Sequence, residues 1–233
     1  MIYGYCVRRA DDPAPGDDLT GITGASVYLL EERGLGLWYS ELDRSPVAEV
    51  QQLREHDAVV RAALRSATPL PLRFGATFKD EDVARAKLRE RSEIFFSSLE
   101  AVADRLEMGI RVSPVAADRS TEILAREDQA VAPADTIRTG REYLEARRRQ
   151  LDSTAAARLW AEEAAARVEA HLSDLELPTK REIIVDQGVL ALVAHLVQRS
   201  EVRTYRSRVE AMRESVPELH LVLTGPWAPY SFV

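Results

Sequence analysis

One long stretch, residues 136–177, constrains the fold of this 233-residue chain more than any other part. It is rich in Ala, Glu and Arg, contains no glycine or proline after Gly140, and is followed at once by Pro178. These residues favour helix, and proline cannot continue one, so the pattern predicts a single long helix that ends before Pro178. Residues 107–115 on one side, and 181–186 and 189–198 on the other, are predicted strands, the last two forming a hairpin about residues 186–188.

The second half of the chain therefore has a recognisable order. Residues 200–215 predict a helix, and residues 218–224 predict a final strand with Leu219, Leu221 and Leu223 on one face. From residue 107 onward the order is strand, helix, strand, strand, helix, strand, which is the ferredoxin-like order. Residues 106–233 are thus predicted to form a ferredoxin-like α+β domain with an unusually long first helix.

The first half has a different order. Residues 2–8, 25–32 and 35–41 predict strands, the last two joined near Gly34, and Ser45-Pro46 predicts the start of a helix that runs to about residue 66. That helix places apolar side chains and one histidine on one face: Val50, Leu53, His56, Val60 and Leu64. Residues 69–78 are extended, and a second helix follows over residues 79–106. Since this is not the ferredoxin-like order, the sequence predicts two domains, residues 1–105 and 106–233.

Charge and composition exclude several classes of protein. The net charge is −7 and neither half is basic, so nothing indicates a nucleic-acid partner. No apolar run approaches the roughly 20 residues that span a bilayer, and the beginning of the chain lacks a signal-peptide layout. Cys6 is the single cysteine, which excludes an intrachain disulfide. We therefore expect a cytoplasmic protein without a membrane partner.

Motifs for catalysis, metal binding or cofactor binding are lacking. The four histidines, at positions 56, 171, 195 and 220, do not form a His-x-x-x-His pair, and none has zinc-ligand spacing with Cys6. The glycine pairs lack the context of a phosphate-binding loop, and no GxSxG motif is present. His56 and His195 are predicted to be buried core histidines. The chain is accordingly predicted to be no enzyme and to need no metal or cofactor.

Four strings spread over the chain carry a family resemblance. They are PLPLRFGATF at residues 69–78, GPWAPYSF at 225–232, LREHDAVVRAAL at 53–64 and GREYLEARR at 140–148. In their order along the chain they resemble the gas vesicle protein F/L family, with the F and L types left undistinguished. The resemblance implies two α+β domains, the second a modified ferredoxin-like fold, and a place in the cytoplasm and at gas vesicles. It also implies binding of the small hydrophobic wall protein and of other vesicle proteins, as an accessory chaperone or adapter, or as a minor vesicle component.

The residues for such binding are sought in the first domain. The hairpin of residues 25–41 could offer an unpaired edge, and with Arg73 it supplies the candidate partner-binding residues: Leu35, Leu37, Trp38, Tyr39 and Arg73. The alternatives are that the hairpin side chains face the core and that Arg73 forms an ion pair with a neighbouring carboxylate. Residues 225–233 could be a packed structural segment or a ligand for another vesicle protein. The alternative function is a small-molecule-binding or enzymatic ferredoxin-like protein.

Overall fold

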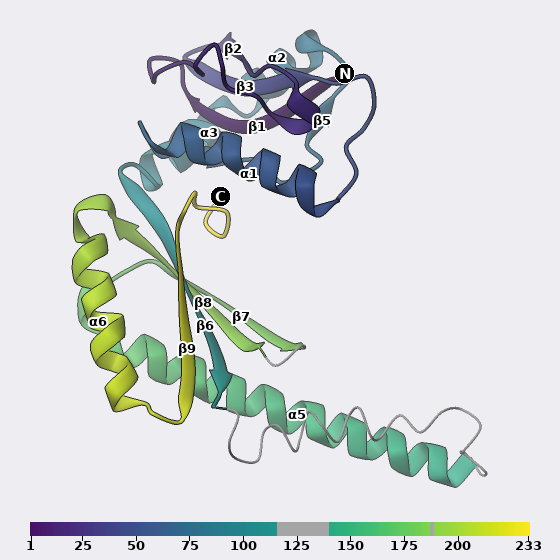
Figure 1. Ribbon diagram of the computed structural model, residues 1–233, viewed down its shortest axis with the longest axis vertical. Coiled ribbons are helices and arrows are strands. Elements are labelled where there is room, and N and C mark those ends of the chain that lie inside the picture. Colours follow the sequence, from purple (N-terminus) through teal and green to yellow (C-terminus); the bar gives the residue numbers. More distant parts are fainter. Residues whose placement is uncertain (116–139, 187–188) are drawn as a thin grey trace. The chain divides into compact units, whose positions relative to one another are not determined.

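The computed structural model describes residues 1–115, 140–186 and 189–233, and these fall into two compact units (Figure 1). The first unit comprises Met1–Glu107, Leu196–Arg199 and Gly225–Val233. The second comprises Met108–His195 and Ser200–Thr224. Two short segments from the second half of the sequence therefore belong to the first unit.

The first unit is built on an antiparallel sheet in the order β2-β3-β1-β4, with β5 also paired to β1. The strands are β1 (Ile2–Arg9), β2 (Tyr28–Glu32), β3 (Leu35–Glu41), β4 (Leu70–Pro71) and β5 (Thr77–Phe78). Arg33 and Gly34 join β2 to β3 with φ values of 50° and 78°. A two-residue turn with both residues in the left-handed region matches the twist of a hairpin, and the predicted hairpin is confirmed.

Helices cover both faces of this sheet. Tyr3 and Tyr5 of β1 face α1 (Val50–Leu64), where their rings lie 5.7 and 5.6 Å from the ring of His56. The opposite face packs against α2 (Glu81–Glu90) and α3 (Ser92–Ala101). The buried cluster on that side contains Leu35 and Leu37 of β3 together with Leu88 and Leu99 of the helices. The central strands are consequently buried on both sides.

Two helix predictions in this unit need correction. The helix α1 begins at Val50 rather than at Ser45-Pro46, because the Val47 amide donates to the Gln52 side chain at 3.0 Å instead of entering a helical turn. Val50 and Leu53 were expected on the inner face, but they are 65% and 41% exposed. The buried face of α1 is formed instead by His56, Val59, Val60, Ala63 and Leu64.

The predicted helix of residues 79–106 is two helices and the start of a strand. Asp80 caps α2 by accepting a hydrogen bond from the Val83 amide at 2.9 Å. Arg91, with φ −108° and ψ 14°, separates α2 from α3. The apolar periodicity continues across this break, so the pattern alone did not reveal it.

The second unit contains a sheet in the order β7-β8-β6-β9. The elements that lie wholly or mostly in this unit are β6 (Arg105–Pro114), α5 (Gly140–His171), η3 (Ser173–Leu175), β7 (Thr179–Asp186), β8 (Val189–Gln198), η4 (Arg199–Glu201), α6 (Val202–Ser215) and β9 (Leu219–Trp227). Among the described residues the strands and α-helices follow one another in the order expected from the sequence. Residues 187–188 of the predicted hairpin turn, and residues 136–139 of the predicted long helix, lie outside the described residues.

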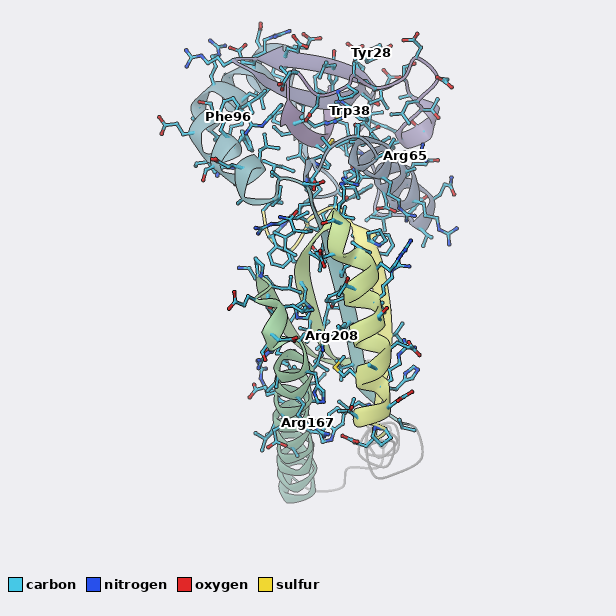
Figure 2. All side chains as sticks on the ribbon, turned by 90° about the vertical axis from the view of Figure 1, so that its left-hand side faces the viewer. Tyr28, Trp38, Arg65, Phe96, Arg167 and Arg208 are labelled. Carbon is cyan, nitrogen blue, oxygen red and sulfur yellow. The ribbon has the colours of Figure 1, made fainter. Side chains whose placement is uncertain are left out.

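The described α-helices of this unit, α5 and α6, pack on the same face of its sheet. Arg181 of β7 binds Glu169 of α5, and in the sheet register Arg181 lies opposite Val193 of β8. His195, two residues after Val193 and therefore on the same face, binds Tyr205 of α6. Arg167 and Arg208, labelled in Figure 2, pair with Glu218 and Asp174 at the surface.

The alanine-rich part of α5 packs on the sheet. The buried residues of α5 and its end recur at helical spacing on one side: Ala157, Ala161, Ala164, Ala165, Val168 and Leu172. Small side chains allow the helix axis to approach the sheet closely. Leu159, on another side of the helix, is 59% exposed.

Candidate functional site

Four of the five predicted partner-binding residues lie in the core of the first unit. Leu35, Leu37, Trp38 and Tyr39 are 0%, 1%, 4% and 6% exposed. Trp38, labelled in Figure 2, lies under the guanidinium of Arg8, whose Cζ is 4.9 Å from the ring centroid. Contact with a partner stays a prediction for these residues, and their burial favours the alternative that they face the core.

The outer edge of the hairpin is also partly occupied. Strand β2 is the edge strand, and its pairing with β3 leaves the Glu31 carbonyl pointing outward. Arg85 of α2 donates to that carbonyl at 2.5 Å and lies 3.9 Å from the Glu32 carboxylate. An arginine side chain that occupies an edge carbonyl hinders the addition of another strand.

Arg73, the fifth predicted residue, is exposed on a well-fixed turn. Ala76 donates its amide to the Arg73 carbonyl at 3.1 Å, and Gly75 has a φ of 90° that favours glycine. Both flanks are bonded to β1, from the Leu72 amide to the Tyr5 carbonyl at 2.8 Å and from the Gly4 amide to the Ala76 carbonyl at 2.9 Å. Within the described residues, the Arg73 side chain makes no ion pair, so the expected bridge to a carboxylate is not formed.

Tyr3 and His56 form a buried hydrogen-bonded pair that contacts the residues of this turn. The Tyr3 hydroxyl lies 2.7 Å from Nδ1 of His56, and Nε2 of His56 lies 3.1 Å from the Leu72 carbonyl oxygen. Because a carbonyl can only accept, Nε2 carries the proton and Nδ1 accepts from the Tyr3 hydroxyl. The ring of Phe74 stacks edge-on against both partners. Burial lowers the pKa of His56, which keeps the imidazole neutral.

The buried histidines of both units are held by hydrogen bonds to tyrosine hydroxyls. Both ring nitrogens of His56 are used in fixed hydrogen bonds, and His195 similarly binds the Tyr205 hydroxyl through Nδ1 at 2.8 Å. Burial raises the pKa of the Cys6 thiol to about 12, which opposes formation of a reactive thiolate. The described part of the chain contains no cluster of three or more His, Cys, Asp or Glu side chains that could hold a metal ion.

An exposed apolar surface lies at the start of α1. Val47, Val50 and Leu53 are 58%, 65% and 41% exposed. Beside them is a hollow of about 460 Å³ lined by residues of η1 (Ile22–Gly24), of α1 and of the segment before it: Ile22, Thr23, Leu42, Asp43, Arg44, Ser45, Pro46, Val47, Glu49 and Gln52. We call Val47, Val50 and Leu53 the α1 apolar surface. Sequence reasoning missed it because helical periodicity assigned Val50 and Leu53 to the inner face.

Residues 225–233 pack on the first unit, as in the structural alternative given for this segment. Trp227 lies beneath the guanidinium of Arg61, with Cζ 4.9 Å from the ring centroid. Phe232 packs against the buried cluster of the unit. The buried carboxylate of Glu107 accepts two hydrogen bonds of 2.8 Å from Ser231, one from its amide and one from its hydroxyl. No sequence pattern links Glu107 to Ser231, which lie 124 positions apart.

The chain is similar throughout its length to gas vesicle proteins. It is 29% identical to gas vesicle protein L of Streptomyces sp. (strain CB03234), an alignment that covers 100% of this chain and 92% of that protein. It is 22% identical to gas vesicle protein F1 of Halobacterium salinarum over 100% of this chain and 92% of that protein. None of the helices among the described residues is long and apolar enough to cross a membrane.

Solved structures give the same picture for the fold. The crystal structure of GvpF from Anabaena sp. PCC7120 superposes with a TM-score of 0.75 at 19% identity, covering 99% of this chain and 94% of that one. GvpF from Microcystis aeruginosa superposes with a TM-score of 0.70 at 18% identity, covering 99% and 98%. The mixed α and β class, with two antiparallel sheets, is thereby confirmed. The model of the gas vesicle synthesis protein GvpL/GvpF family matches residues 1–233, and the chain belongs to that family.

Proposed function

We propose that this protein serves gas vesicle formation by binding the small hydrophobic wall protein of the vesicle. Two roles fit such binding, that of an accessory chaperone or adapter and that of a minor vesicle component. Family membership over the whole chain supports a role beside other gas vesicle proteins. We further propose that the protein acts in the cytoplasm and at the vesicle.

The observation that carries the binding proposal is the α1 apolar surface. Val47, Val50 and Leu53 lie on one short stretch and are 58%, 65% and 41% exposed. A group of exposed apolar side chains next to a hollow is typical of a surface that binds a partner. A partner that buries them gains roughly 25 cal/mol for each Å² of apolar area removed from water. A wall protein that assembles by apolar contacts would present a matching surface.

The charge of the protein supports a chaperone-like role. A net charge of −7 makes separate copies repel one another. A complex that covers apolar wall protein with an acidic binder would remain dispersed until assembly. Arg73, exposed and unpaired within the described residues, is proposed as a polar contact at the edge of this interaction.

We propose two domains, residues 1–105 and 106–233, with wall-protein binding assigned to the first. The second is proposed to be a modified ferredoxin-like domain. Its sheet order β7-β8-β6-β9, together with two helices on one face, supports that assignment. The length of α5, 32 residues, is the proposed modification.

The test is capture of purified wall protein by variants of the full chain. Replacing Val50 and Leu53 together by Asp should lower retention about tenfold or more, since two buried aliphatic side chains are each worth about 1.5–3 kcal/mol. Leu159→Asp on α5, at an equally exposed apolar position, is the matched control and should bind normally. Thermal melting of all variants should match that of the parent. Equal retention by the double variant and the parent would remove the α1 apolar surface from the interaction.

A second candidate, small-molecule binding, is favoured only by the hollow beside this surface. Its volume of about 460 Å³ falls within the range of ligand pockets, and its lining mixes polar and apolar groups. A metabolite that raised the melting temperature of the parent, but not of a Gln52→Trp variant that fills the hollow, would favour this function.

A further inference from the structure

The contact between residues 225–233 and the first unit centres on one buried carboxylate. Glu107 is 8% exposed, and each of its carboxylate oxygens accepts a hydrogen bond of 2.8 Å from Ser231. A buried carboxylate is stable only when it has such donors. Among the described residues Glu107 forms no ion pair with a lysine or arginine. Its two described hydrogen bonds both come from Ser231 of this segment.

Side chains complete the contact around this carboxylate. Phe232, directly after Ser231, packs partly buried against the core cluster of the unit. Trp227, the last residue of β9, stacks under Arg61, and Ala228, the next residue, is 3% exposed. We call Glu107 and the buried cluster against which Phe232 packs the docking surface. It binds the ring of Phe232 and, next to it, the hydroxyl and the amide of Ser231.

Strand β9 ends at Trp227, and residues 228–233 cover the docking surface outside the helices and strands. Their backbone hydrogen bonds from Tyr230 to Ala228 and from Phe232 to Pro229 are internal. Among the described hydrogen bonds of residues 228–233, those that reach the rest of the unit are the two to Glu107. Tyr230 and Val233 are 36% and 48% exposed. A segment held by a few side chains opens locally far more easily than a paired strand does.

We propose that the docking surface is a peptide-binding site whose resident ligand is the chain's own 228–233 segment. The external ligand is a segment of a partner protein in which a serine or threonine directly precedes an aromatic residue. Its hydroxyl and amide donate to the two oxygens of Glu107, and its ring takes the place of Phe232. Ser231 and Phe232 of the resident segment make these same contacts. Because the resident segment competes for the docking surface, it lowers the affinity for the partner. This site goes beyond the α1 apolar surface and does not depend on wall-protein binding.

The test measures binding of a fluorescently labelled peptide, APYSFV, the sequence of residues 228–233, to full-length protein by fluorescence anisotropy. Wild-type protein should bind it weakly, because the resident segment competes. Phe232→Ala should bind it at least about tenfold more tightly, since loss of the ring weakens the resident segment. Ser231→Ala is a second variant with the same expectation should Phe232→Ala fail to fold. Adding Glu107→Gln to either variant should weaken binding about tenfold or more, because one accepting oxygen and the charge are lost.

Peptides test the proposed ligand chemistry in the same assay. A peptide with threonine in place of the serine should bind, whereas peptides with alanine in place of the serine or of the following phenylalanine should not. The proposal would be overturned if the peptide bound the wild type as tightly as Phe232→Ala and Ser231→Ala, or if Glu107→Gln left peptide binding unchanged. Concentration-dependent dimers of the wild type that are lost in Phe232→Ala would show a second copy as the occupant, and would overturn the assignment to a different partner protein.

Discussion

Gly21 occupies a position in the first unit where a single methyl group should be strongly destabilising. A Cβ atom built there would lie 1.8 Å from the Tyr5 hydroxyl oxygen, 2.6 Å from the carbon that bears it, and 3.1 Å from Oγ of Ser40. The backbone φ of Gly21 is −107°, so collision and not a left-handed conformation makes the substitution unfavourable. Gly21→Ala must therefore displace Tyr5 or the loop.

The magnitude follows from the hydrogen bonds of Tyr5. Ser40 donates its hydroxyl to the Ser26 carbonyl at 2.8 Å, so the Tyr5 hydroxyl donates to Ser40 at 2.8 Å and accepts from the Ile22 amide at 3.0 Å. Displacing Tyr5 breaks both bonds and leaves buried polar groups without partners. At about 1 kcal/mol for each bond, with a further penalty for unsatisfied groups, we expect a loss of about 2–4 kcal/mol in the free energy of unfolding.

The assay is guanidinium unfolding, followed by circular dichroism and by tryptophan fluorescence, to which Trp38 of the first unit contributes. Gly16→Ala is the matched control, because the nearest atom to its added Cβ is the Asp18 carboxylate at 3.5 Å, and it should lie within about 0.5 kcal/mol of the parent. Tyr5→Phe should make Gly21→Ala less costly in a double-mutant cycle, since it removes the closest atom. Equal stability of the Gly21→Ala and Gly16→Ala variants would refute this reasoning.

Three further predictions concern other parts of the molecule. Burial lowers the pKa of His195 to about 4, against about 6.5 in the unfolded chain, so the free energy of unfolding should be highest above pH 6.5 and should fall by roughly 3 kcal/mol toward pH 4. His195→Asn should reduce this dependence of the free energy of unfolding on pH, measured by unfolding at several pH values. Tyr205→Phe should cost about 1–2 kcal/mol at pH 7 in the same assay, because it removes the hydroxyl bonded to buried His195. Arg199→Ala should lower stability by about 1 kcal/mol by removing the hydrogen bond to the Leu64 carbonyl at the end of α1, whereas Arg203→Ala, at an exposed site on α6, should change it little.

The sequence predicted those features whose cause is local. Gly34 with its flanking apolar residues predicted the β2–β3 hairpin, and the two-residue turn in the structure has the expected backbone. The absence of helix breakers after Gly140 predicted α5, and Pro178 marked where the helical stretch had to be over. Such local signals also gave the order of the described strands and helices from β6 onward, whereas the predicted helix of residues 79–106 is α2, α3 and the start of β6.

Features that depend on distant residues were not predictable in this way. The Gln52 side chain bonds the Val47 amide and delays the start of α1, which leaves Val50 exposed although its spacing suits a core position. The hydrogen bond between Tyr3 and His56 joins residues 53 positions apart, and no short sequence motif predicts it. For the candidate site, the sequence identified Arg73 as a possible exposed contact but left open whether Trp38 faces a partner or the core, and the structure buries it.

The most direct test of the central claim is co-purification of the wall protein with this protein when the two are produced together without any other vesicle protein. We predict that affinity capture of the intact chain retains soluble wall protein in a fixed ratio, and that the wall protein produced alone is found in the insoluble fraction. Retention should survive a wash that removes wall protein from an unrelated acidic protein of similar size. Wall protein that passes through unretained, while the captured chain is folded by circular dichroism, would contradict the proposed function.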